Sequence, residues 1–510
     1  MTGLLRTQWM MLRTMLWWLV VPSLIMAGLV WTAAVQISAL YPEEVHRRAY
    51  ALSVSDSVAV RVFQGRGYDL ATVGGIFAQE MAVVVLFIFP LLTVFLGVRF
   101  TRSLEDNNYL DIITAGPVHR LAPTVAGALH GLAVCLLTAV LSFVALLSTS
   151  GFPTGGSALW ATVLFLFLTW SLSLAVLSSQ IFRNGTEAMY MAVAFVLGCY
   201  LLRAVVDVRD WHATWSNPMS WLAETQAFSN DRPLWPFLAY VALIMVQLGL
   251  ALLFVTRRDL GGGIIPARTG RDRAGPLLAG PVSLISRLVH WPLAAFAIIG
   301  GVVALTFGLF AEEMATAGLD KRLVLLVQLN AIIAAAAGVL VSGRFSVEEQ
   351  KGRSGRVLAG NVSRVRWQVS GVLVALSGST LLLLMLAALS GVGVALSLDE
   401  RSRLTDAMES SAQQLPAVLL LVSASLVFGS LIPRLSSAAW ALVGWALVVA
   451  LRADVLQLPD WARRLSPFEW TGKVPKEDWN SGDSLTMAGI ALLLVLLSVS
   501  LFRRRDLVRG

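Results

Sequence analysis

Long apolar stretches alternate with short polar ones along the whole chain, and the apolar stretches are close to the length that a membrane requires. About 20 apolar residues in a helix cross a hydrocarbon core that is about 30 Å thick. The expected membrane-spanning helices are residues 16–35, 80–98, 123–147, 158–180, 188–206, 234–255, 292–311, 323–342, 368–396, 415–431, 438–451 and 485–502. We therefore predict an all-α polytopic membrane protein with twelve spans.

One polar segment between these stretches occurs twice. Residues 99–120 read RFTRSLEDNNYLDIITAGPVHR, and residues 344–364 read RFSVEEQKGRSGRVLAGNVSR. AGPVHR begins at Ala115 and AGNVSR at Ala359, an offset of 359 − 115 = 244. Further matches in the same order are Ile181-Phe182-Arg183 with Ile432-Pro433-Arg434, Arg203 with Arg452, Pro218-Met219-Ser220-Trp221 with Pro467-Phe468-Glu469-Trp470, and Arg257-Arg258-Asp259-Leu260 with Arg504-Arg505-Asp506-Leu507. Ordered self-similarity of this kind indicates an internal duplication.

The duplication predicts three parts of the chain. Residues 1–256 form a first six-span half, residues 257–288 a cytoplasmic linker, and residues 289–510 a second six-span half. The linker is rich in Gly, Pro and Arg, which is typical of a flexible connection. Two halves of equal topology form a pseudo-dimer around an axis along the membrane normal.

Composition agrees with this class and sets the orientation. Hydrophobic residues make up 57% of the chain and charged residues 14%, whereas soluble domains carry roughly 25% charged residues. The net charge of +8 is explained by Lys and Arg in cytoplasmic loops, so no nucleic-acid partner is needed. Both termini are predicted to be cytoplasmic. Cys135 and Cys199 fall inside spans, where a thiol is a small apolar packing group.

Two other polar stretches predict local structures. Residues 1–15 place Arg6 and Arg13 among Leu, Met and Trp, as in a helix that lies in the membrane interface or in an ordinary basic flank. Residues 209–233 are too polar to span, and their tryptophans suit the interface. Asn217 and Pro218 favour a broken helical hairpin there.

The repeated segment also carries a family resemblance. Paired acids, Gly and Arg, followed by Ala-Gly, Pro or Asn, and Val, resemble the membrane subunits of ABC-2 type exporters, and most closely the fused twelve-span antibiotic exporter permeases of the tetronasin-resistance type. The resemblance covers essentially the whole chain. It implies a coupling helix in each half, docked in a groove of a separate ATPase subunit that is present in two copies. The implied coupling residues are Glu105, Asp106, Pro117, Arg120, Glu348, Glu349, Arg353, Arg356 and Arg364. The alternative is that these segments only anchor helices at lipid headgroups.

The two copies fit the family pattern unequally. In the second copy only Asn361 departs, where Pro is usual, but in the first Asn107, Asn108 and Tyr109 replace the Gly and Arg. A weakened first coupling site is therefore expected. Replacement of Glu349 is expected to harm coupling more than replacement of Glu105.

A search of the sequence for catalytic and nucleotide-binding motifs gives little indication of chemistry in this chain. GxxxxGK[ST] does not occur, the one Gly-Lys pair being Gly472-Lys473, so ATP and Mg are expected on the partner, with no cofactor and no enzymatic activity in this chain. Polar residues inside spans are costly and often functional, although hydrogen bonding across packed helices is the favoured explanation for each one. The candidates are His130, Arg203, Gln247, Gln328, Asn330 and Arg452.

The function predicted from the sequence is a plasma-membrane permease that exports amphiphilic or lipophilic compounds such as antibiotics. One alternative is a secondary transporter of the major facilitator type, which would show a GxxxDRxGRR-like loop that this sequence lacks. Another is a polytopic glycosyltransferase that uses a lipid-linked sugar, for which Glu43 and Glu44 in the first outer loop are candidate catalysts.

Overall fold

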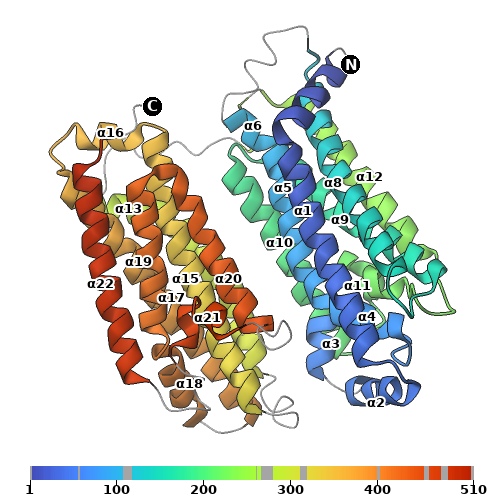
Figure 1. Ribbon diagram of the computed structural model, residues 1–510. Coiled ribbons are helices and arrows are strands. Elements are labelled where there is room, and N and C mark those ends of the chain that lie inside the picture. The colour runs from blue at the N-terminus through green and yellow to red at the C-terminus, as the bar shows by residue number, and fades with distance from the viewer. Residues whose placement is uncertain are drawn as a thin grey trace. The chain divides into compact units, whose positions relative to one another are not determined.

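The computed structural model shows two compact helical units, Met1–Gly270 and Arg271–Gly510 (Figure 1). It describes residues 3–55, 58–106, 118–259, 261–265, 280–309, 319–398, 402–452, 459–471 and 480–506, and these residues contain no strand. The division falls inside the predicted linker 257–288. The duplication and the boundaries of its halves stay predictions.

Unit 1 consists of helices that follow one another with short connections. They are α1 (Leu4–Leu40), α2 (Glu44–Ser55), α3 (Val58–Gln64), α4 (Val73–Val83), η1 (Val84–Ile88), α5 (Phe89–Phe100), α6 (Arg102–Asp106), α8 (Ala122–Leu147), α9 (Thr154–Ile181), α10 (Gly185–Val208), η2 (Thr214–Ser216), α11 (Pro218–Glu224) and α12 (Trp235–Arg257). Helix α9 is central and contacts α5, α8, α10 and α12.

The described residues of unit 2 also form a series of helices. Its elements are α13 (Pro281–Leu309), α15 (Leu319–Gln350), α16 (Arg353–Leu358), α17 (Arg364–Leu398), α18 (Ser402–Ala412), α19 (Leu415–Leu431), η3 (Pro433–Ala438), α20 (Ala439–Arg452), α21 (Asp460–Arg463), η4 (Pro467–Glu469) and α22 (Ser481–Arg504). Helix α15 is central and contacts α13, α17, α19 and α20.

The predicted spans are confirmed as helices. Twelve helical stretches in the described residues are long and apolar enough to cross a membrane, and each predicted stretch overlaps one of them. The chain is therefore an all-α polytopic membrane protein. Helix α1 is longer than the predicted 16–35 because the stretch before it continues the helix, with a kink at Met15 (φ −120°, ψ 19°). The kink thus lies at the end of the stretch 1–15, for which a helix in the membrane interface was one expectation.

Glycine permits a close helix crossing in unit 2. A Cβ on Gly308 of α13 would lie 2.3 Å from the carbonyl oxygen of Ser390 in α17, and a Cβ on Gly393 would lie 2.5 Å from that of Leu305. Small residues at such crossings let helix backbones approach in membranes, where hydrophobic burial does not drive association.

The polar stretches before the last long helix of each unit share a local contact. Trp221 donates its indole N–H to the carbonyl of Trp215 at 2.9 Å, and Trp470 donates to that of Arg464 at 2.8 Å, six residues back in both cases. In unit 1 Pro218, Met219 and Trp221 are buried, so this segment is a packed short helix.

Candidate functional site

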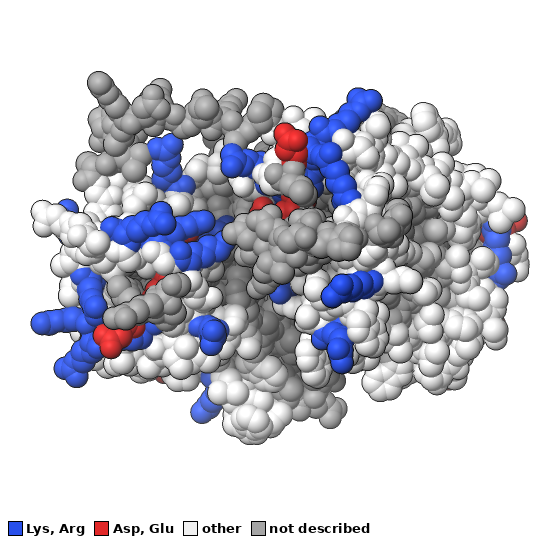
Figure 2. Space-filling model, turned by 90° about the horizontal axis from the view of Figure 1, so that it is seen from above, with Lys and Arg blue, Asp and Glu red and all other residues white. Residues whose placement is uncertain are grey.

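Basic side chains gather at one end of each unit, the end that carries α6 in unit 1 and α16 in unit 2. We call this the basic end, and Figure 2 looks onto it. Among its described Lys and Arg residues are Arg99, Arg102, Arg120, Arg183, Arg257 and Arg258 in unit 1, and Arg344, Lys351, Arg353, Arg356, Arg364, Arg366, Arg434, Arg503, Arg504 and Arg505 in unit 2. The described parts of the repeated polar segments lie here.

In unit 1 a buried carboxylate joins two arginines. Glu105 in α6 accepts from Arg102 Nη1 at 2.6 Å and from Arg258 Nη1 at 2.8 Å, and its second oxygen pairs with Arg258 Nη2. The exposed fractions are 7% for the Glu105 side chain and 3% for that of Arg258. Arg258 follows α12, so this pair connects the start of the repeated segment to the end of the last long helix.

The neighbouring acid fixes the same segment to another helix. Asp106 accepts the backbone N–H of Gly185, the first residue of α10, at 2.7 Å, where a carboxylate satisfies an N–H group that has no partner within the helix. Arg102 donates to the carbonyl of Arg183 at 2.7 Å. Burial lowers the pKa of the Arg102 guanidinium, and the Glu105 carboxylate opposes that change.

Unit 2 contains a corresponding pair. Helix α15 continues to Gln350 and buries Glu349, whose Oε2 lies 2.6 Å from Arg505 Nη2. Arg505 follows α22, the last long helix, and its carbonyl accepts from Arg364 Nη1 at 2.8 Å. Gly352, at a φ of 67°, then turns the chain into α16, a conformation that glycine adopts without strain.

Helix α16 presents a basic surface. Lys351, Arg353 and Arg356 are exposed, and Ser354 between them is buried. Arg353 makes a 3.1 Å ion pair with Glu348 while its side chain remains 57% exposed. This surface is suited to an acidic groove of another protein.

The predicted coupling residues thus divide into two groups. Arg120, Arg353 and Arg356 are exposed and Arg364 is half-buried, whereas Glu105 and Glu349 are paired inside their own units. Pro117, Asn107 and Asn108 lie outside the described residues. The expected difference between Glu349 and Glu105 therefore has no support in their surroundings, since both are buried acids with an arginine partner. Their coupling role stays a prediction.

Two of the candidate polar residues inside spans bond to neighbouring helices. Ser173 of α9 donates to Gln247 Oε1 of α12 at 2.5 Å, and Asn330 of α15 donates to Ser390 of α17 at 3.2 Å. Gln328 is buried, and the side chain of Arg452 lies outside the described residues. Gln247 and Asn330 therefore link packed helices, as the favoured explanation expected.

His130 is different because its ring is fully buried without a well-formed hydrogen bond. It lies edge-on to Phe100 at 4.7 Å between centroids and near the backbone of Met15, where α1 kinks. Neither ring nitrogen has a normal partner among the described residues. The ring thus acts as a packing group at the kink.

Three important residues were not predicted as site residues. Arg258 and Arg505 were noticed only as part of the repeated Arg-Arg-Asp-Leu, and that repetition was the available signal. Gln368 of α17 donates to Ser430 of α19 and Ser498 of α22, both at 3.1 Å. Nothing in the sequence near Gln368 distinguishes it from an ordinary residue at the start of a span.

At the opposite end of unit 1, Arg203 of α10 bonds to the last turn of α3. Its side chain is 1% exposed, lies 3.2 Å from Asp207 and stacks over Tyr200 at 4.7 Å. It also donates to the carbonyls of Val62 and Phe63. Arg203 therefore ties α10 to the end of α3.

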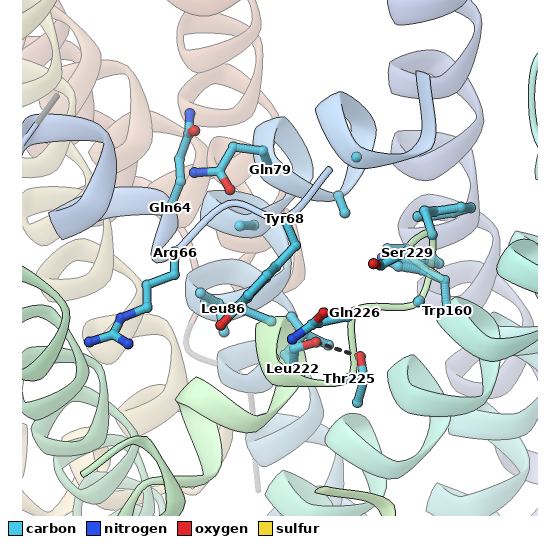
Figure 3. Close-up of a pocket in the computed structure, with 16 residues that line it drawn as sticks. Gln64, Arg66, Tyr68, Gln79, Leu86, Trp160, Leu222, Thr225, Gln226 and Ser229 are labelled. Atoms are coloured by element: carbon cyan, nitrogen blue, oxygen red, sulfur yellow. Dashed lines mark hydrogen bonds between the residues drawn. The ribbon is translucent and has the colours of Figure 1, made fainter. Parts of the chain in front are cut away.

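A small cavity with a mixed polar and apolar lining lies beside the loop that follows α3 (Figure 3). Its volume is about 50 Å³, and Gln64, Gln79, Trp160 and Gln226 are among its lining residues. Binding sites for drug-sized molecules have about 300–1,000 Å³, whereas about 10–15 Å³ holds one water. Its size therefore suits water molecules.

A second cavity is almost entirely apolar and lies between α8, α9 and α12. Its volume is about 170 Å³, and Leu129, Leu172, Val176 and Leu252 are among its lining residues. An apolar cavity of about 150 Å³ holds a molecule the size of benzene. It has room for a small hydrophobic group.

The geometry can now be set beside known proteins. Residues 278–503 match the family model described as the C-terminal domain of the multidrug efflux system permease Rv1217c. The chain is similar to a permease. The multidrug efflux system permease protein Rv1217c of Mycobacterium tuberculosis (strain ATCC 25618 / H37Rv) is 27% identical to it over 496 residues, which cover 92% of this chain and 89% of that protein. The permease-like match thus extends through both units.

Proposed function

We propose that this chain is the membrane subunit of an ATP-driven exporter that moves amphiphilic or lipophilic drug-like compounds out of the cell. The observation that carries the proposal is the similarity to a multidrug efflux system permease over 92% of the chain. The twelve helices that can cross a membrane support a transporter. The transported compounds and the outward direction come to this chain from the relative's name.

The energy source is proposed to be a separate ATPase. The sequence has no phosphate-binding loop, and each unit carries a polar segment at its basic end. Because basic loops are retained in the cytoplasm, the basic ends and both termini are assigned to that side. Two such segments would receive two ATPase subunits. The exposed arginines of α16 would donate charge-assisted hydrogen bonds to acidic groups of the partner.

Transport assays in proteoliposomes test the proposal. The purified chain alone should neither hydrolyse ATP nor accumulate a lipophilic cationic dye, and dye accumulation should require ATP and an ATPase subunit encoded next to this chain. Dye transport by the chain alone in a proton or sodium gradient would contradict the proposal and favour a secondary transporter.

A matched pair of variants tests the docking surface. Arg353→Glu with Arg356→Glu reverses two exposed charges on α16 and should reduce ATPase binding and stimulation at least tenfold. Arg48→Glu with Arg209→Glu reverses two exposed charges at the other end of unit 1 and should leave both unchanged. Equal effects of the two variants would show that α16 is not the docking surface.

A further inference from the structure

At the basic end of each unit, the described residues include a buried ion pair between residues that are far apart in the chain. Glu105 and Arg258 are 153 residues apart, and Glu349 and Arg505 are 156 residues apart. In unit 1 the acid follows the second long helix, and in unit 2 it lies in the last turn of that helix, α15. In both units the arginine follows the last long helix. The arginines belong to the repeated Arg-Arg-Asp-Leu, and the acids are separated by 349 − 105 = 244 residues, the same offset as AGPVHR and AGNVSR.

Burial makes these pairs unlike ordinary surface salt bridges. The exposed fractions are 7% for Glu105, 4% for Glu349, 3% for Arg258 and 17% for Arg505. An exposed pair contributes about 0–1 kcal/mol. A buried pair gains little net stability because both charges lose water, but the loss of one partner leaves an uncompensated charge. Such pairs are better suited to holding two elements in one geometry than to stabilising the fold.

Additional hydrogen bonds make both connections rigid. Arg258 donates to Gln180 Oε1 at the end of α9 at 2.8 Å and to the carbonyl of Gly262 at 3.0 Å. In unit 2 the carbonyl of Arg505 accepts from Arg364 at the start of α17. The segment and the end of the last helix are therefore joined through several contacts rather than one flexible side chain.

We propose that the Glu105–Arg258 and Glu349–Arg505 pairs are latches that make the repeated segment and the last long helix of each unit move as one body. This rests on the proposed function, in which the segment receives an ATPase. Movement of the ATPase would then displace α12 and α22 directly. Glu349 and Glu105 act as positioning residues, because their carboxylates face their own unit and not the partner.

The test is made on the pair of unit 2. Glu349→Gln removes the charge with little change of shape, and Arg505→Gln removes the other charge. Glu349→Arg with Arg505→Glu exchanges them. In proteoliposomes with the ATPase, each single variant should bind the ATPase normally but export at least tenfold fewer molecules per ATP hydrolysed. The exchange should recover most of that ratio.

The control is a pair without burial. Glu44 and Arg48 form an ion pair in α2 with side chains 62% and 71% exposed, and Glu44→Gln should leave the export ratio unchanged. Thermal unfolding of the chain alone gives an independent readout. If the two residues are paired, each single variant should lower the midpoint, and the shift of their combination should differ from the sum of the two single shifts.

The outcomes separate the latch from the proposed function. Normal export per ATP by Glu349→Gln and Arg505→Gln, with an unaltered protein that exports, would overturn the latch alone. So would additive midpoint shifts. Absence of ATP-driven export by the unaltered protein would overturn the proposed function itself and the latch with it.

Discussion

Replacement of Arg203 by Met tests whether this buried arginine holds the end of unit 1 together. The substitution keeps a long apolar side chain but removes the charge that faces Asp207 at 3.2 Å. Asp207, with a side chain 4% exposed, would then have only the longer contact to Arg66 at 3.6 Å. The carbonyls of Val62 and Phe63 would lose their charged donor.

The magnitude follows from the asymmetry of buried pairs. Removal of one partner of a buried pair costs about 3–5 kcal/mol, whereas replacement of both by uncharged groups of similar volume is often neutral. Hydrogen bonds between membrane helices average about 0.6 kcal/mol, so an effect near 3 kcal/mol would identify the uncompensated charge as its cause. At about 2–4 °C per kcal/mol, Arg203→Met should lower the midpoint by roughly 6 °C or more.

Tryptophan fluorescence during heating measures this midpoint directly, since the chain has 17 Trp. The double variant Arg203→Met with Asp207→Asn should recover most of the loss, and Arg209→Met, at an exposed position, should change little. Unchanged stability of Arg203→Met, or a double variant less stable than the single one, would refute the reasoning.

Three further predictions concern packing, pairing and orientation. Gly393→Ala should destabilise unit 2 strongly because the added Cβ would lie 2.5 Å from the carbonyl oxygen of Leu305. Gly489→Ala, with open space around it, should be neutral or slightly stabilising. Equal midpoints of the two variants would disprove the close crossing. Glu105→Ala should lower the midpoint more than Glu349→Ala, because it removes the carboxylate that Arg102 and Arg258 share, and a smaller shift for Glu105 would show that its contacts are not formed. After Cys135 and Cys199 are replaced by Ala, single cysteines at exposed Asn361 and Gly482 should react with an impermeant maleimide from opposite membrane faces, and reaction from one face would overturn the topology.

The length of the apolar stretches alone was sufficient to predict the membrane-spanning helices. A helix that crosses lipid must satisfy its backbone internally and remain apolar for about 20 residues, so each span leaves a local signal in the sequence. The polar stretches between spans are equally local. The segment 209–233 was predicted to be a broken hairpin because of its Asn217-Pro218, and the structure begins α11 at Pro218.

The sequence showed which segments form the candidate site but not which of their side chains are buried. Sequence located both repeated segments and the exposed arginines of α16, but it did not show that the Glu349 side chain is buried against Arg505. Glu348 and Glu349 are the same residue type at adjacent positions, so the sequence does not show which of the two side chains is buried. The direction in which α15 packs decides which of them is buried.

The sequence by itself determined the membrane class, the twelve spans and the recurrence of two polar segments, because each depends on local composition or on comparison of letters. Only the tertiary structure decided that Glu105 meets Arg258, that Glu349 meets Arg505 and that Gln368 bonds to Ser430 and Ser498. Apolar helices resemble one another and can pack in many arrangements. The partners of a polar group more than a hundred residues away are therefore set by packing geometry, which no local pattern encodes.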